Sequence, residues 1–181
     1  MSDALKSDAT QTRATRADLL ALLDALGLAH RTVEHEAIVT VDEGRHLKAQ
    51  LPGGHSKNLF LKDKAGKLYL AVALGETRVD LVGLGKKIGA KGRLSFASAE
   101  LLTASLGVTP GAVTPFGLMN ETARRLSGVV VDSALLAHDP VWFHPLENTA
   151  STVVSPAGFL RFLDHCRVLP LVLDLAAPLA S

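Results

Sequence analysis

Residues 58–74 read NLFLKDKAGKLYLAVAL, and this stretch decides the fold. Two runs rich in apolar and aromatic residues, 58–62 and 67–72, flank the segment 63–66, whose sequence DKAG ends in glycine as many tight turns do. Side chains of this kind favour extended backbone, and the polar segment between them gives the chain a place to reverse. The stretch therefore predicts a β-hairpin.

Capping signals predict where helices begin. Thr15 precedes Asp18, and Thr40 precedes Glu43, at the spacing of a capping box. Glycine and proline residues end these two helices near residue 27 and before residue 52. The other predicted helices cover 80–88, 98–106 and a final segment that begins with the serine–proline pair at 155–156.

Short strands are predicted on both sides of the hairpin. They cover 31–34, 93–96, 113–116, 128–132, 141–143, 150–154 and 169–175. So many strands leave too little chain for regular βαβ crossovers, and the predicted fold class is α+β, with a mixed, partly barrel-like β-sheet surrounded by helices. Residues 1–14 are polar and have no apolar period, which predicts a flexible N-terminal tail, and residues 15–177 are predicted to form a single domain.

Composition narrows the functional classes. Of the 181 residues, 48% are hydrophobic and 20% are charged, which excludes a disordered chain, and the longest apolar runs are too short to cross a bilayer. Nineteen Lys and Arg residues oppose eighteen Asp and Glu residues, and neither this balance nor any recognition-helix pattern favours DNA as a partner. The only cysteine, Cys166, excludes an intrachain disulfide, and the absence of an apolar leader before Leu19 predicts a cytoplasmic location.

Three short segments concentrate polar and conformationally special residues. Lys57 is either a solvated surface charge or a cation that grips a phosphate or carbonyl oxygen beside a glycine-containing loop. Gly111 is either part of a turn or a point where exposed backbone amides, held between prolines, orient an ester carbonyl. His144 is either satisfied at a strand end or forms a pocket wall that makes one hydrogen bond near the reacting group.

Several other kinds of chemistry are not indicated. The histidines show no metal-ligand spacing, no serine lies in a nucleophile elbow, and the glycines follow neither nucleotide-binding pattern. The sequence therefore predicts no metal and no cofactor, and no side chain stands out as a general base.

Five motifs in order carry a family resemblance: HEA at 35–37, TVDE at 40–43, KNLFLKD at 57–63, GVTPGAVTPFG at 107–117 and FHPLENT at 143–149. Together they resemble the YbaK/aminoacyl-tRNA synthetase-associated domain family, specifically its prolyl-tRNA deacylase branch, over roughly residues 16–175. The resemblance implies a free-standing homologue of the editing domain of bacterial prolyl-tRNA synthetase, with the fold of that domain. Such enzymes act in trans and hydrolyse alanine wrongly attached to proline tRNA.

The resemblance also implies roles for particular residues. Lys57 matches the lysine that the family requires for deacylation, and Asn58 matches its constant neighbour. Gly111 and Pro115 match the Gly-x-x-x-Pro motif beside the aminoacyl ester. The remaining matches are His144 and Asn148 of the His-Pro-Leu-x-Asn motif. The segment 166–170, CRVLP, departs from the Gly-His-x-Pro stretch expected there, which affects local packing and not the site.

These matches define the expected site and its partners. Lys57, Gly111 and His144 are the expected catalytic residues, and the bulky Phe116 is a candidate for the floor of an amino acid pocket. The expected partner is the acceptor end of aminoacylated proline tRNA, and prolyl-tRNA synthetase is a further candidate. The alternatives are editing of cysteine or serine on the same tRNA, and a non-catalytic sensor of charged tRNA.

Overall fold

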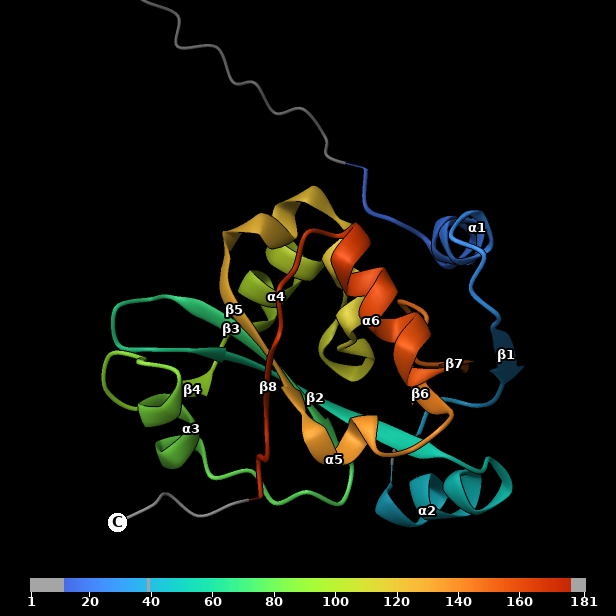
Figure 1. Cartoon of the computed structure of the whole chain (residues 1–181), viewed down its shortest axis with the longest axis horizontal. Coiled ribbons are helices and arrows are strands. Elements are labelled where there is room, and N and C mark those ends of the chain that lie inside the picture. Colours follow the sequence, from blue (N-terminus) through green and yellow to red (C-terminus); the bar gives the residue numbers. More distant parts are fainter. Residues whose placement is uncertain (1–11, 39, 177–181) are drawn as a thin grey trace, which may run out of the picture.

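A computed structural model describes residues 12–38 and 40–176, and its centre is one mixed β-sheet (Figure 1). Within the described residues the sheet has eight strands, of which seven follow the order β1-β7-β6-β2-β3-β5-β8, and the eighth, β4, pairs with β2 off this path. The β2–β6, β3–β5 and β5–β8 pairs are parallel, and the others are antiparallel. The strands are β1 (Arg31–Glu34), β2 (Gly54–Lys62), β3 (Leu68–Leu74), β4 (Ser95–Phe96), β5 (Leu126–Asp132), β6 (Val141–Phe143), β7 (Ala150–Val154) and β8 (Leu171–Leu173).

Helices surround this sheet, and the predicted α+β class is confirmed. The α-helices are α1 (Arg16–Ala25), α2 (Val41–Gln50), α3 (Leu81–Lys87), α4 (Ala99–Leu106), α5 (Ser133–Leu136) and α6 (Pro156–His165). Three 3-10 segments, Pro110–Ala112, Pro115–Met119 and Glu121–Arg125, lie between α4 and β5. None of the helices in the described part of the chain is long and apolar enough to span a bilayer.

The predicted capping boxes are confirmed at the start of α1 and α2. The Thr15 side chain accepts a hydrogen bond from the Asp18 N–H, and the Asp18 carboxylate accepts one from the Thr15 N–H in return. Thr40 and Glu43 make the same reciprocal pair. Because each pair satisfies two backbone donors that a helix leaves unpaired, the short polar sequence fixes both start points.

The predicted hairpin is confirmed as β2 and β3, and Asp63 organises its turn. The Asp63 carboxylate accepts hydrogen bonds from the backbone N–H groups of Ala65 and Lys67 at 2.9 and 3.0 Å, and from that of Lys91 at 2.9 Å. These bonds lower the pKa of Asp63, the bond from Lys91 contributing most. One side chain thus closes the hairpin and also holds the loop that follows α3.

Two predictions about local structure are wrong. The segment 113–116 is not a strand but joins two 3-10 segments, because Pro110 and Pro115 have no N–H to give to a strand ladder. In addition, the first strand of the hairpin begins at Gly54 and not at Asn58, so Lys57 lies inside a strand. The short helix α5 was not predicted.

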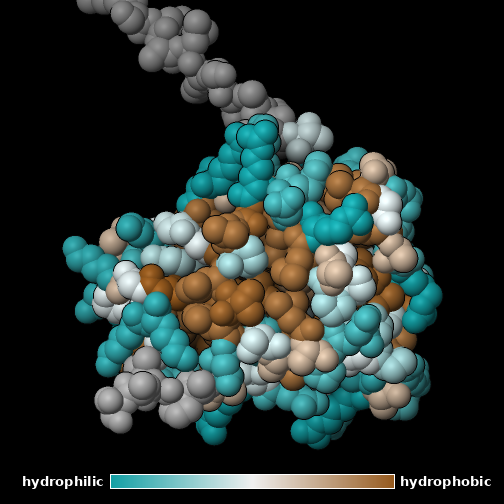
Figure 2. Space-filling view, in the orientation of Figure 1, coloured by the Kyte–Doolittle hydropathy of each residue, from teal (hydrophilic) through white to brown (hydrophobic). Residues whose placement is uncertain are grey.

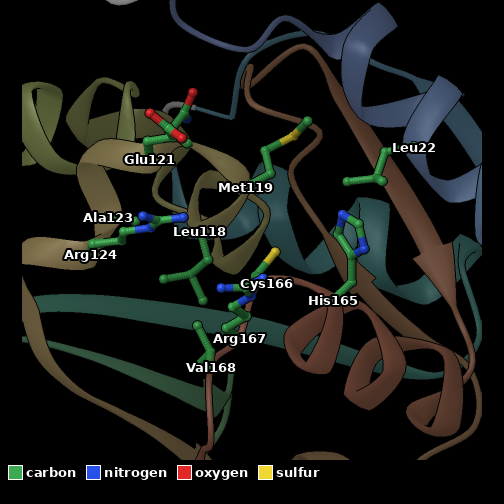
Figure 3. A pocket seen from close by; sticks show the side chains of 11 residues that line it. Leu22, Leu118, Met119, Glu121, Ala123, Arg124, His165, Cys166, Arg167 and Val168 are labelled. Carbon is green, nitrogen blue, oxygen red and sulfur yellow. The ribbon is translucent and has the colours of Figure 1, made fainter.

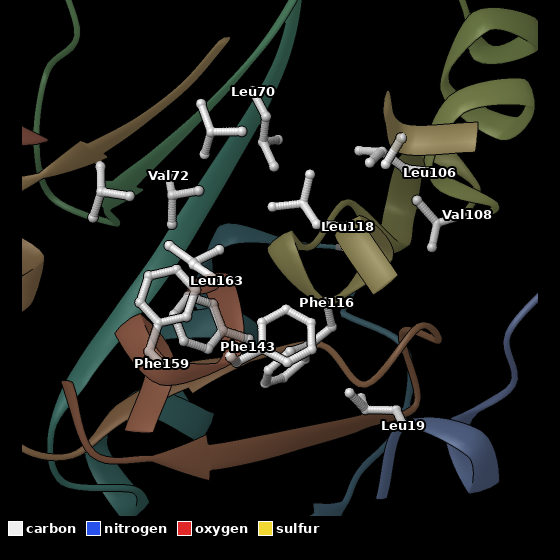
Figure 4. Packing of buried hydrophobic residues seen from close by; sticks show 14 of the residues in the cluster. Leu19, Leu70, Val72, Leu106, Val108, Phe116, Leu118, Phe143, Phe159 and Leu163 are labelled. Atoms are coloured by element: carbon white, nitrogen blue, oxygen red, sulfur yellow. The ribbon is translucent and has the colours of Figure 1, made fainter. Parts of the chain in front are cut away.

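The core divides between the two faces of the sheet. The larger cluster packs α1, α4, α6 and the 3-10 segments on one face, and its centre is a group of aromatic rings (Figure 4). The rings of Phe116 and Phe143 lie 5.4 Å apart edge to face, and those of Phe143 and Phe159 lie 4.6 Å apart. On the other face, smaller clusters pack α3 against β2 and β3, and α2 against Trp142 of β6.

The sheet ends in an apolar edge at β8. Leu169 is 95% exposed, and Leu171 and Val172 of the strand are also exposed. Figure 2 shows apolar surface where β8 crosses the front of the molecule.

At the N-terminal side, the division into a tail over 1–14 and one domain over 15–177 stays a prediction, because residues 1–11 and 177–181 lie outside the described residues. The Ala14 N–H donates to Asn120 at 2.9 Å, so the packed chain begins before Thr15.

Candidate active site

A cleft of about 640 Å³ lies between α2 and the sheet. Arg45 and Lys48 of α2 form one side of it, and His55 and Ser56 of β2 form another. The remaining walls include Gly75, Glu76, Phe143, His144 and Ser151. The pairing between β2 and β6 covers only residues 54–55 and 141–142, so the cleft opens where these two strands cease to pair.

His144, one of the predicted catalytic residues, lines this cleft with a fixed ring. Its Nδ1 lies 3.1 Å from the Ala150 carbonyl oxygen. A carbonyl oxygen can only accept, so Nδ1 carries the proton and Nε2 of the neutral ring keeps its lone pair. Burial lowers the pKa of His144, and the nearby His35 adds to this effect. The ring is therefore neutral at pH 7, with Nε2 able to accept a hydrogen bond.

Ser151 lines the same cleft and contacts His35 behind it, although the sequence analysis placed neither residue in the site. The His35 Nδ1 lies 2.8 Å from the Glu36 carbonyl oxygen, and its Nε2 lies 2.8 Å from the Ser151 hydroxyl oxygen. The rings of His35 and His144 lie 6.3 Å apart. His35 and Ser151 meet only through the pairing of β1 with β7, so no local pattern brings them together.

Lys57 and Asn58 are neighbours on β2 and point to opposite faces of the sheet. Lys57 shares the face of His55, and its Nζ donates to the carbonyl oxygen of Thr77, just after the cleft residues Gly75 and Glu76. The structure therefore places Lys57 beside the cleft, with its ammonium directed to the turn after β3.

Asn58 lies on the opposite face of β2 from Lys57, and its side chain connects three segments of the chain. Its Nδ2 donates to the Val113 carbonyl at 3.1 Å and to the Ser56 hydroxyl at 3.1 Å. Ser56 in turn donates to the Trp142 carbonyl at 2.9 Å. The Asn58 Oδ1 is buried and has no hydrogen-bond partner among the described residues. Asn58 thus links β2 both to β6 and to the segment that contains Gly111.

Gly111 and Asn148, two of the predicted site residues, lie next to each other. A Cβ at position 111 would lie 3.1 Å from the Asn148 Nδ2, so any larger residue would have to displace that amide. Gly111 itself is exposed, and it lies in the first turn of a 3-10 segment. The first backbone N–H groups of a helical turn have no partner within the turn and can bind an oxygen atom.

Phe116 is not the floor of the cleft. The residue is fully buried, and its ring packs edge to face on Phe143 and on Phe162. Phe143 lines the cleft and separates Phe116 from it. Pro115 is also buried, in the same 3-10 segment. These two residues therefore support the wall from behind, because the apolar face of this segment turns into the main core.

A second cavity, of about 770 Å³, lies between α1, the 3-10 segments and the end of α6 (Figure 3). Its lining includes Met119, Arg124, Cys166 and Arg167, and none of the predicted site residues. Burial raises the pKa of the Cys166 thiol to about 12, so this side chain is not a ready nucleophile.

In the described part of the chain, no three His, Cys, Asp or Glu side chains come together as a metal site requires.

Comparison with known proteins finds relatives that match this chain over most of its length. Residues 35–162 match the aminoacyl-tRNA editing domain family. The chain is 37% identical to prolyl-tRNA synthetase associated domain-containing protein 1 of Mus musculus, over 88% of this chain and 95% of the mouse protein. It is also 37% identical to prolyl-tRNA editing protein ProX of Acetoanaerobium sticklandii, over 76% of this chain and 83% of that protein.

The fold has counterparts among solved structures. One is a crystal structure described as a candidate trans-editing enzyme for prolyl tRNA synthetase, with a TM-score of 0.67 and 23% sequence identity. The match covers 92% of this chain and 100% of that one. The sheet and its surrounding helices are therefore shared by the two proteins.

Proposed function

Because this chain belongs to the aminoacyl-tRNA editing domain family, we propose that it is a trans-acting deacylase that hydrolyses alanine wrongly attached to proline tRNA. The observation that carries this proposal is the fixed tautomer of His144 on the wall of the cleft. A neutral ring whose Nε2 accepts a hydrogen bond can hold a water molecule against an ester carbonyl.

The reaction needs three groups around the ester. Water held by the Nε2 of His144 attacks the carbonyl carbon, forming a new C–O bond and passing its proton to the ring. Backbone N–H groups near Gly111 stabilise the oxyanion that develops on the carbonyl oxygen. The bond between the carbonyl carbon and the ribose oxygen then breaks, and that oxygen takes the proton as the free alanine leaves. Lys57 supplies positive charge for the phosphate and ester end of the acceptor strand.

Discrimination follows from the size of the amino acid. An apolar pocket distinguishes one methylene group by only about 1 to 3 kcal/mol, so a synthetase that activates proline also accepts some alanine. A second site that admits only the smaller side chain removes the error. Phe143, held from behind by Phe116, is the bulky wall that we assign to this exclusion.

The test is hydrolysis of alanyl, seryl, cysteinyl and prolyl esters, all on proline tRNA. We expect rapid loss of alanine, no loss of proline, and at least a hundredfold slower reaction for Lys57→Ala and His144→Ala. Lys67→Ala, an exposed lysine of the same hairpin, is the matched control and should behave as wild type. Loss of serine or cysteine in place of alanine would reassign the substrate. Binding of every charged tRNA without turnover would identify a sensor and refute the proposal.

A further inference from the structure

A row of side chains crosses the sheet on the face covered by α2. Trp142 lies opposite His55 in the parallel pair of β6 with β2. The two rings are 5.9 Å apart and 8° from parallel, so they are stacked. The guanidinium carbon of Arg31 lies 5.2 Å from the Trp142 ring on the far side of this row. The row therefore ends, toward the cleft, in the ring of His55.

The next position in the row is Gly75, which has no side chain to continue the stack. The Gly75 N–H donates to the His55 carbonyl at 2.7 Å, so the two residues are direct neighbours. A Cβ at position 75 would lie 2.9 Å from the Nζ of Lys48 and 3.1 Å from the His55 carbonyl oxygen. The ammonium of Lys48 therefore occupies the space beside His55 that a side chain at 75 would otherwise fill.

His55 is held as a neutral, oriented ring. Its Nε2 lies 2.7 Å from the Leu51 carbonyl, so Nε2 carries the proton. Burial lowers the pKa of His55, and the charge of Lys48 adds to this effect. The ring is only half-buried and lines the cleft. A flat aromatic ring supported by a second ring is the kind of surface on which a nucleobase stacks.

The charges around this slot suit a nucleotide. Arg45 and Lys48 both line the cleft from α2, and cations at the edge of a stacking surface attract phosphate groups. Glu76 lines the same cleft and offers acceptor oxygens to hydroxyl or amino groups of a nucleoside. A purely apolar ligand would use neither kind of group.

We propose that the slot at Gly75, between His55 and Lys48, is a nucleobase subsite that binds the terminal base of the tRNA by stacking on His55. On binding, the Lys48 ammonium leaves the slot and pairs with the adjacent phosphate. The proposal rests on the proposed function, because it places the terminal nucleotide next to Lys57 and the ester. It assigns to His55, Gly75 and Lys48 a binding role that is separate from the chemistry at His144.

The test compares two uncharged proline tRNAs, one complete and one that lacks the terminal adenosine, at a fixed salt concentration. The wild type should bind the complete tRNA about 5- to 150-fold more tightly, the range that one stacked base contributes. His55→Ala should bind both tRNAs equally, and His55→Phe should keep the preference because it keeps a stacking ring. Gly75→Val should also lose the preference, because its side chain fills the slot and leaves His55 in place.

His46→Ala is the matched control, since His46 is exposed on α2 and bonds only to Gln50 of the same helix in the described structure. It should retain the wild-type preference. In deacylation assays, His55→Ala should raise KM for alanyl-tRNA with kcat within about threefold of wild type, as expected for a residue that only binds. Urea unfolding of each variant shows whether it is folded. If His55→Ala does not fold, the binding of the two tRNAs by Gly75→Val tests the subsite in its place.

Two outcomes would overturn the subsite. One is a wild-type protein that binds both tRNAs equally, and the other is a preference that survives both His55→Ala and Gly75→Val. A failure of the proposed function is separate and recognisable. In that case the preference for the terminal adenosine depends on His55 and Gly75, yet no aminoacyl ester is hydrolysed.

Discussion

Asp132 is a fully buried carboxylate whose removal should destabilise the protein and loosen the turn beside the cleft. Its Oδ2 accepts hydrogen bonds from the Leu74 N–H at 3.1 Å and from the Thr77 hydroxyl at 2.7 Å. Its Oδ1 accepts one from the Ala134 N–H at 3.1 Å. Thr77 presents its carbonyl to the Lys57 ammonium, so Asp132 supports Lys57 through this turn.

The cost of each substitution follows from these bonds. Asp132→Ala loses all three hydrogen bonds and leaves their donors buried, which should cost roughly 3 to 5 kcal/mol of unfolding free energy. Asp132→Asn keeps the bond from Ala134, and the Thr77 hydroxyl can reverse to accept from the new amide. Only the Leu74 N–H is then unpaired, so the expected cost is about 1 to 3 kcal/mol. Thr77→Val removes a single bond and should cost about 1 kcal/mol.

Urea unfolding followed by the fluorescence of Trp142, the only tryptophan, measures these differences. A double-mutant cycle of Asp132→Asn with Thr77→Val should show coupling, since the two side chains share one bond. Asp164→Asn, on the exposed side of α6, is the control and should lie within about 0.5 kcal/mol of wild type. The reasoning is refuted if Asp132→Ala is no less stable than Asp164→Asn, or if the cycle shows no coupling.

Three further measurements test the packing and the charges. Burial lowers the pKa of His55 and His144, so the unfolded chain takes up protons at a higher pH than the folded chain does. The unfolding free energy should therefore be highest above about pH 6.5 and should fall as the pH drops below that value. Urea titrations at pH 7.5 and 5.5 measure this fall, which should be smaller in His55→Phe. Phe116→Ala should cost about 3 to 5 kcal/mol in the same assay, because the ring is fully buried against two other aromatic rings; a loss below 1 kcal/mol would contradict this packing. Cys166, with its pKa raised to about 12, should react with a thiol reagent at pH 8 far more slowly in the native protein than in urea, and equal rates would show that it is not buried.

The elements that the sequence predicted well are those that short-range interactions determine. The capping boxes at Thr15 and Thr40 satisfy their helices within four residues, and the DKAG segment closes its own hairpin through Asp63. The segment 113–116 was predicted as a strand, although Pro115 lies within it and Pro110 precedes it. The two prolines exclude a ladder, and the structure forms 3-10 turns there.

Contacts between distant strands could not be predicted in this way. His35 bonds to Ser151 across 116 residues, and Ser56 bonds to Trp142 across 86. Neither pair has a local periodicity, because each depends on which strands become neighbours in the sheet. The tautomer of His144 likewise depends on the carbonyl of Ala150, which is the first residue of β7 and pairs with Glu34 of β1. The sequence therefore named His144 as a candidate, but which of its ring nitrogens can accept a proton became visible only with the structure.

Lys57 and Asn58 show how one motif can serve two sides of a site. Adjacent residues of a strand point to opposite faces, so both cannot touch the same substrate atom through their side chains. Lys57 faces the region of the cleft, whereas Asn58 holds the backbone of Val113 and so fixes the segment that carries Gly111. A substitution at Asn58 would thus act through the position of the Gly111 amides, even though its side chain bonds to the wall and not to the reacting ester. The alternation of the strand therefore places a charged residue on the side of the cleft and a structural amide on the opposite face.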